Sequence, residues 1–177
     1  MIFTEGRLKG VYILSLERIV DHRGFFARAF VHNEFEACGL NTTWIQANIV
    51  GSRKKGTIRG LHYQIAPHEE IKLIQCVRGA IFDVIIDLRH QSPTYKQWLG
   101  IDLTADNKKM LYIPHGFAHG YQAVTDDTEV FYLASRYYAP DYERGVRWND
   151  PGFHIQWPEM KTTIVSTKDM HWPDYVA

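Results

Sequence analysis

With 177 residues, of which 45% are hydrophobic and 14% aromatic, the chain is long enough to bury its own core and too apolar for intrinsic disorder. Lys plus Arg and Asp plus Glu balance at 20 each, which excludes the strong net charge typical of nucleic-acid or membrane-surface binding. The two cysteines, Cys38 and Cys76, lack metal-ligand spacing, and no apolar run has the length of a membrane span. We therefore expect a soluble, cytoplasmic protein with one domain, 1–177, and with neither nucleic-acid nor membrane partners.

Short β-type runs separated by turn residues follow one another along most of the chain. The first, 10–16, precedes the polar stretch Asp21-His22-Arg23-Gly24, which is typical of a turn. Further strands are predicted at 24–30, at 43–49, across Arg59 and His62, and at 72–78, 80–88, 98–103, 110–113, 119–124 and 129–135.

Little helix is expected. Asn33 followed by Glu36 resembles a helix start and Gly39 a helix stop, so one short helix is predicted between them. From about residue 140 the chain is irregular and rich in Trp and Pro, and we expect 140–177 to form an arm packed on the body. Regularly spaced strands with few short helices indicate an all-β sandwich or barrel.

A basic and polar run, Lys54-Lys55-Gly56-Thr57-Ile58-Arg59-Gly60-Leu61-His62-Tyr63-Gln64, is the centre of this pattern and is typical of a strand that lines a pocket. Arg59 and His62 are three residues apart, so a regular strand would point them to opposite faces. Both can reach one pocket if Gly60 allows a bulge or if Arg59 enters from the rim. We predict the bulge.

A second motif, Pro114-His115-Gly116-Phe117-Ala118-His119-Gly120, contains the Pro-x-Gly-x-x-His pattern found in cupin barrels, which have a double-stranded jelly-roll fold. Metal-binding cupins combine it with an earlier His-x-His and a Glu. Here the earlier segment reads His62-Tyr63-Gln64, so Gln64 stands where the second histidine is needed. We therefore predict no bound metal.

Many further motifs occur in order along the chain. They are Asp21-x-Arg23-Gly24-x-Phe26, Arg59 to Gln64, Lys72-Leu73, Asp83-Val84, Asp87-Leu88-Arg89, Ser92-Pro93-Thr94, Pro114 to Gly120, Tyr137-Tyr138, Trp148-Asn149-Asp150, Trp157-Pro158 and Ser166-x-Lys168-Asp169. The set resembles the dTDP-4-dehydrorhamnose 3,5-epimerase family over nearly the whole chain. The resemblance implies a cupin-type double-stranded β-helix barrel without metal or cofactor. It also implies a homodimer whose N-terminal strands pair across the interface.

The implied reaction is epimerisation of a nucleotide-linked 4-keto-6-deoxyhexose at C3 and C5 in deoxysugar biosynthesis. Inverting a carbon beside a ketone requires a base, an acid on the other face and stabilisation of the enolate. By resemblance, His62 is the base and Asp169 the carboxylate that orients it, Tyr132 is the acid, and Lys72 is the cation near the enolate oxygen. The residues matched to substrate contacts are Arg23, Arg59, His119 and Lys168 (diphosphate, sugar and keto oxygen), Gln46 and Asn48 (nucleoside side), Tyr138 (stacking on the base) and Glu143 (unassigned).

The chain also departs from the family pattern. Arg28 stands where the family commonly has a Glu that contacts thymine; Glu can accept the imide N–H, whereas Arg only donates. Glu69-Glu70-Ile71 replaces a more usual Gln-Gly before Lys72. The nucleobase and the choice between single and double epimerisation therefore stay open.

Plainer interpretations exist for each residue. His62 could be a hydrogen-bonded core residue, Tyr132 could serve packing alone, and Ser166-Thr-Lys-Asp169 also fits a helix-capping box. Three alternative functions follow: a single-site epimerase on another nucleotide sugar, a metal-dependent cupin enzyme, and a non-catalytic sugar-binding cupin.

Overall fold

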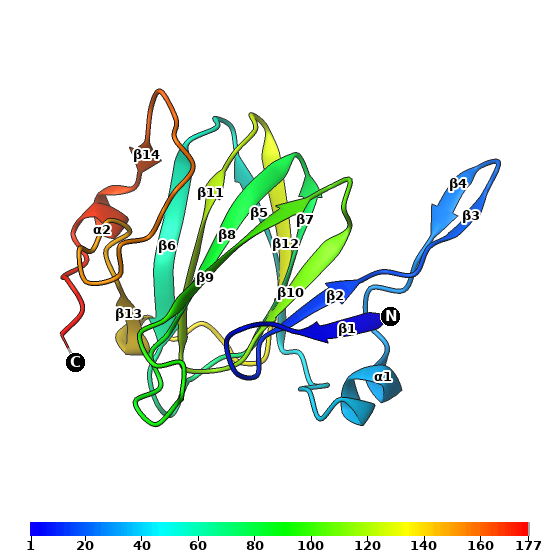
Figure 1. Ribbon diagram of the computed structural model, residues 1–177, viewed down its shortest axis with the longest axis horizontal. Coiled ribbons are helices and arrows are strands. Elements are labelled where there is room, and N and C mark those ends of the chain that lie inside the picture. The colour runs from blue at the N-terminus through cyan, green and yellow to red at the C-terminus, as the bar shows by residue number, and fades with distance from the viewer. Residues whose placement is uncertain (177) are drawn as a thin grey trace.

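The structure, a computed structural model, describes residues 1–176 as two facing β-sheets (Figure 1). In spatial order, the first sheet contains β1 (Ile2–Glu5), β2 (Tyr12–Ser15), β10 (Lys109–Ile113), β7 (Lys72–Arg78), β12 (Thr128–Ala134) and β5 (Gln46–Ser52). The second contains β13 (Glu143–Gly145), β6 (Thr57–Gln64), β11 (Phe117–Ala123), β8 (Ala80–Asp87) and β9 (Trp98–Thr104), with the short β14 (Ile164–Val165) parallel to β6. This is the all-β, cupin-type jelly roll that the sequence predicts.

The strands predicted between residues 72 and 135 are confirmed to within two residues at each end. Their sequences indicate strands because turn residues bound each run and the runs are rich in β-branched and aromatic side chains. Between the sheets lies a core that includes Leu8, Ile74, Ile85 and Leu111, all fully buried. This core fixes which face of each strand points inward and therefore which side chains can reach a pocket.

The second predicted strand, 24–30, is too long. Only β4 (Gly24–Phe26) is extended, and it pairs with the unpredicted β3 (Ile19–Asp21) in a hairpin that projects away from the sheets (Figure 1). Phe30 leaves the ladder because its ring packs against Phe35, with the ring centroids 4.9 Å apart. The predicted turn between the two strands is confirmed.

The predicted helix exists as α1 (His32–Ala37), but its predicted start is wrong. Asn33 lies inside the helix, and the N-cap is Val31, which offers no side-chain hydrogen bond. The fully buried Phe35 anchors α1 on the outer face of the first sheet, so tertiary packing replaces the capping signal. The strand predicted at 43–49 likewise begins later, at Gln46, because Trp44 packs in the same outer cluster.

Residues after 139 contain η1 (Pro140–Tyr142), β13, β14 and α2 (Thr167–Met170), joined by irregular chain. Phe153, Trp157 and Tyr175 pack with Leu61 and Val84 of the second sheet. This packing holds α2 against β6, on the side of the barrel opposite the β3–β4 hairpin (Figure 1). Within residues 1–176, no helix has the length and apolar character needed to cross a membrane.

Candidate active site

A bulge in β6 shapes the site. His62 lies opposite His119 and Arg59 opposite Tyr121, so β6 has one residue more than β11 over this interval. Gly60 falls within the interval with φ +115°, and a Cβ at this position would lie 2.6 Å from the Cα of Gly120. Arg59 and His62 therefore line one pocket, and the predicted bulge is confirmed.

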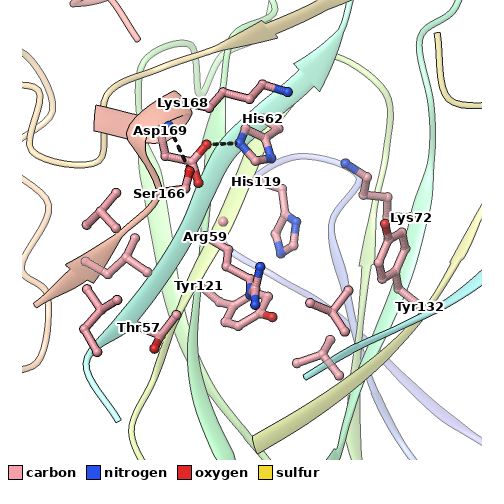
Figure 2. A pocket seen from close by; sticks show the side chains of 16 residues that line it. Thr57, Arg59, His62, Lys72, His119, Tyr121, Tyr132, Ser166, Lys168 and Asp169 are labelled. Carbon is pink, nitrogen blue, oxygen red and sulfur yellow. Dashed lines mark hydrogen bonds and ion pairs between the residues drawn. The ribbon is translucent and has the colours of Figure 1, made fainter. Parts of the chain in front are cut away.

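Two adjoining pockets, of about 490 and 340 Å³, share His62, Lys72 and Tyr132 in their walls. The first pocket, shown in Figure 2, is also lined by Arg59, His119, Tyr121, Lys168 and Asp169. The second is also lined by Gln46, Asn48, Glu70, Tyr138 and Glu143. All the sequence-predicted site residues except Arg23 thus lie in these two pockets.

His62 and Asp169 form a close pair on one wall of the first pocket. Nε2 of His62 lies 2.6 Å from Oδ1 of Asp169, and the other ring nitrogen faces the pocket (Figure 2). Burial alone would raise the pKa of Asp169, but the contact with His62 holds it below its usual value. The ionised carboxylate of Asp169 accepts a hydrogen bond from Nε2–H of His62. In the neutral imidazole, Nδ1 then carries no proton and faces the pocket as an acceptor.

The interpretation of residues 166–169 as a helix cap is also correct, but the cap involves the backbone N–H of Asp169 and not its carboxylate. Ser166 is the N-cap of α2, and its Oγ accepts a hydrogen bond from the Asp169 backbone N–H at 3.1 Å. The Asp169 carboxylate is directed elsewhere: Oδ2 accepts the backbone N–H of Gly60 at 3.2 Å. The cap orients α2, and the carboxylate then contacts both His62 and the bulge.

Tyr132 and Lys72 lie across the pocket from His62 (Figure 2). They come from β12 and β7, neighbouring strands of the first sheet, whereas His62 comes from the second sheet. Burial raises the pKa of Tyr132, and the charge of Glu70 adds to this effect. Tyr132 therefore stays a neutral proton donor at physiological pH.

His119 is held by a carboxylate to which the sequence analysis gave no role. Its Nε2 lies 2.9 Å from Oδ2 of Asp83, which is fully buried. Burial raises the pKa of Asp83, while His119 opposes that rise. An acidic residue in the middle of the run 80–88, which is apolar except for Asp83 and Asp87, was the signal that could have found it.

Exposed cationic and aromatic side chains line the two pockets. The exposed Arg59 donates to Oγ of Ser52 at 3.2 Å and to the carbonyl of Gly51 at 2.8 Å. In the second pocket, Glu143 accepts from the Tyr138 hydroxyl at 2.7 Å and from Lys168. These contacts fix positive charge and one aromatic ring, 56% exposed, in the pocket walls, an arrangement that suits an anionic ligand.

The side chain of Gln64, at the position of the missing metal-ligand histidine, forms hydrogen bonds with backbone groups. Its Nε2 donates to the carbonyl of His68 at 2.8 Å, and its Oε1 accepts the N–H of Ala139 at 2.6 Å. Within residues 1–176, no three His, Cys, Asp or Glu side chains cluster so that they could hold a metal ion. The absence of a metal stays a prediction.

Arg23 lies apart from both pockets. It is exposed at the tip of the β3–β4 hairpin and forms an ion pair with Asp21 at 2.6 Å. The chain by itself therefore does not bring Arg23 to the other substrate-contact residues.

Comparison with known proteins decides the family. A sequence model described as dTDP-4-dehydrorhamnose 3,5-epimerase matches residues 5–176. The chain belongs to this family. The resemblance inferred from its motifs is thereby confirmed, and with it the assignment of the chain as an epimerase.

Individual family members agree with this assignment. The Salmonella typhimurium dTDP-4-dehydrorhamnose 3,5-epimerase is 39% identical over 98% of this chain and 94% of its own length. A Bacillus anthracis epimerase structure with TDP and PPi bound has a TM-score of 0.95 and 41% identity, covering 98% of this chain and 99% of its own. A Legionella pneumophila epimerase structure, in complex with dTDP-4-keto-L-rhamnose, has a TM-score of 0.91 and 32% identity, covering 99% of each chain.

Proposed function

We propose that this protein inverts C3 and C5 of dTDP-4-dehydro-6-deoxyglucose and so produces dTDP-4-dehydrorhamnose. One observation carries the proposal: a histidine–carboxylate pair faces a tyrosine and a lysine across a single pocket. Such an arrangement supplies a base on one face of a sugar ring and an acid on the other. The family membership supports the same reaction.

In the proposed mechanism, Nδ1 of His62 removes the proton from a carbon beside the C4 ketone, while Asp169 stabilises the imidazolium that forms. The negative charge moves to the C4 oxygen, where the Lys72 ammonium stabilises it. Tyr132 then donates its hydroxyl proton to the opposite face of the carbon. Because C3 and C5 both adjoin C4, the same groups serve both carbons if the sugar ring turns over between the two steps.

The other matched residues are proposed to bind the rest of the substrate. Arg59 and Lys168 provide positive charge in the pocket walls, which suits a diphosphate. Gln46 and Asn48 contact the nucleoside side, and His119 the sugar. Tyr138 is exposed enough to stack on a base, with Glu143 holding its hydroxyl.

We further propose a homodimer in which the β3–β4 hairpin of one protomer completes the pocket of its partner. The hairpin exposes four large apolar side chains, Ile19, Val20, Phe25 and Phe26, each at least 51% exposed. An apolar surface of this kind is typical of an interface. The separation of Arg23 from the pockets of its own chain supports the same arrangement.

The free thiols of Cys38 and Cys76 support a cytoplasmic location for this single-domain chain.

The test is incubation of purified protein with dTDP-4-dehydro-6-deoxyglucose in D2O, followed by mass spectrometry and NMR of the product. Two deuterons, at C3 and C5, support double epimerisation, and one deuteron indicates the single-site alternative. Binding without any exchange would contradict catalysis altogether. Unchanged turnover after exhaustive chelation is expected, and a dependence on iron, manganese or zinc would support the metal-dependent alternative.

A further inference from the structure

The second pocket contains a carboxylate, Glu70, that the proposed mechanism does not use. Its Oε1 lies 2.7 Å from Nζ of Lys72, and the two side chains are only 14% and 13% exposed. Both side chains line this pocket together with Tyr132 and His62. Glu70 is therefore the direct partner of the cation that is proposed to stabilise the enolate.

The loop that carries Glu70 is tied to the strand that carries Tyr132. Ile71 donates its backbone N–H to Oγ of Ser135 at 2.8 Å, and Ser135 donates its own N–H to the carbonyl of Ile71 at 3.0 Å. Ser135 directly follows β12. The segments that carry the carboxylate, the ammonium and the phenol are thus joined by two hydrogen bonds between Ile71 and Ser135.

A lysine ammonium at this depth needs a partner. Its stem has four rotatable carbons, and other cations, Arg59 and Lys168, line the first pocket, which Lys72 also lines. Removing one member of a mostly buried pair leaves an uncompensated charge, so the other member moves or changes its protonation state. Glu70 thus restricts Lys72 to the position seen beside Tyr132 (Figure 2).

We propose that Glu70 is a positioning residue: its carboxylate holds the Lys72 ammonium in the pocket wall and places a negative charge in the pocket that Tyr132 lines. The inference rests on the proposed function for its catalytic meaning. A negative charge near a phenol disfavours the phenolate, which cannot donate a proton. In this chain the Glu70 carboxylate adds to burial in favouring the neutral phenol, the form of Tyr132 that donates a proton in the proposed mechanism.

Other charged or titratable groups line the same two pockets as Tyr132, so the experiment must separate their effect on Tyr132 from that of Glu70. β6 contributes Arg59 and His62, β11 contributes His119 and Tyr121, and α2 contributes Lys168 and Asp169. In the second pocket, β13 contributes Glu143, β6 also contributes Tyr63, the chain before η1 contributes Tyr138, and β5 contributes only the uncharged Asn48 and Gln46. A Glu70→Gln substitution leaves all of them in place, so a change in the titration of Tyr132 reports the Glu70–Lys72 pair.

The test uses the free full-length protein labelled with [13Cζ]tyrosine, with the Tyr132 signal assigned by its loss in Tyr132→Phe. Titration by NMR should show that Tyr132 deprotonates at lower pH in Glu70→Gln than in the wild type. Glu70→Asp keeps the charge and should restore most of the wild-type titration. The matched control is Glu69→Gln, which neutralises the adjacent residue, 44% exposed, and should leave Tyr132 unchanged.

Turnover provides the second readout. Glu70→Gln should lower kcat for inversion roughly tenfold with little change in KM, and the alkaline limb of its pH profile should move to lower pH. An unaltered titration of Tyr132 in folded Glu70→Gln would overturn the proposal, as would an unaltered alkaline limb. If the wild type epimerises nothing but the Tyr132 titration shifts, the proposed function fails while the electrostatic role of Glu70 stands.

Discussion

His62 and Asp169 are 107 residues apart in the chain, and their side chains are 2.6 Å apart in the fold. The same carboxylate also accepts the backbone N–H of Gly60, so one side chain of α2 contacts both the proposed base and the bulge that directs it. The C-terminal arm therefore completes the proposed catalytic geometry that β6 begins.

His62→Asn should abolish exchange of substrate hydrogen for deuterium at both carbons, by about a thousandfold or more, because one base serves both steps. Nucleotide-sugar binding, measured by calorimetry, should change little. His154→Asn is the control, since this exposed histidine lies outside both pockets and asparagine tolerates its positive φ of 50°. Retained exchange at either carbon in His62→Asn would show that the base is another group.

Asp169 should contribute stability that depends on pH. Its pKa is lowered in the folded state, so its contribution is complete above the ordinary carboxyl pKa of about 4 and is lost as pH falls through the folded value. Asp169→Asn should therefore have a lower urea midpoint than the wild type at pH 7. At pH 3 the midpoints of the two proteins should approach each other. Asp106→Asn, at an exposed turn, is the control; a constant difference at all pH values would contradict this linkage.

Tyr132→Phe keeps the aromatic ring and its packing but removes the only proton that the side chain can donate. The variant should still exchange substrate hydrogen with solvent through His62, while inverted product falls by about a hundredfold or more. NMR of the sugar recovered from D2O separates the two outcomes. Wild-type inversion by this variant would mean that water or another group is the acid.

Gly60→Ala should destabilise the protein by roughly 2–4 kcal/mol and abolish most of the activity. A methyl group there would meet Gly120 Cα at 2.6 Å and the carbonyl of His119 at 2.7 Å, at a φ that side chains rarely adopt. Gly51→Ala, on the neighbouring sheet, has no atom within 4 Å of the added carbon and should change stability little. Equal denaturation midpoints for the two variants would argue against a constrained bulge.

Coexpression of two inactive chains tests the shared pocket. If Arg23 acts in the partner's pocket, a mixed dimer of Arg23→Ala and His62→Asn chains contains one intact site. Random pairing should then recover about a quarter of wild-type turnover. If Arg23 acts in its own chain, no site is intact and activity stays at the level of the single variants.

The sequence by itself determined the strands from 72 to 135, because the pattern of apolar and turn residues along each run is local information. It also determined the bulge: the odd spacing of Arg59 and His62, together with a glycine between them, leaves few ways to place both in one pocket. The family followed from the order of the motifs. Each of these conclusions depends on residues that are close together in the chain or on their order.

The tertiary structure alone decided contacts between distant segments. The partner of His62 in the pocket is Asp169 of α2, and that of His119 is Asp83 on the adjacent strand. The start of α1 likewise depends on where Phe35 packs, since Val31 provides no capping group. No local pattern encodes these pairings, because they arise from strand register and from burial between sheets, which exist only once the whole chain has folded.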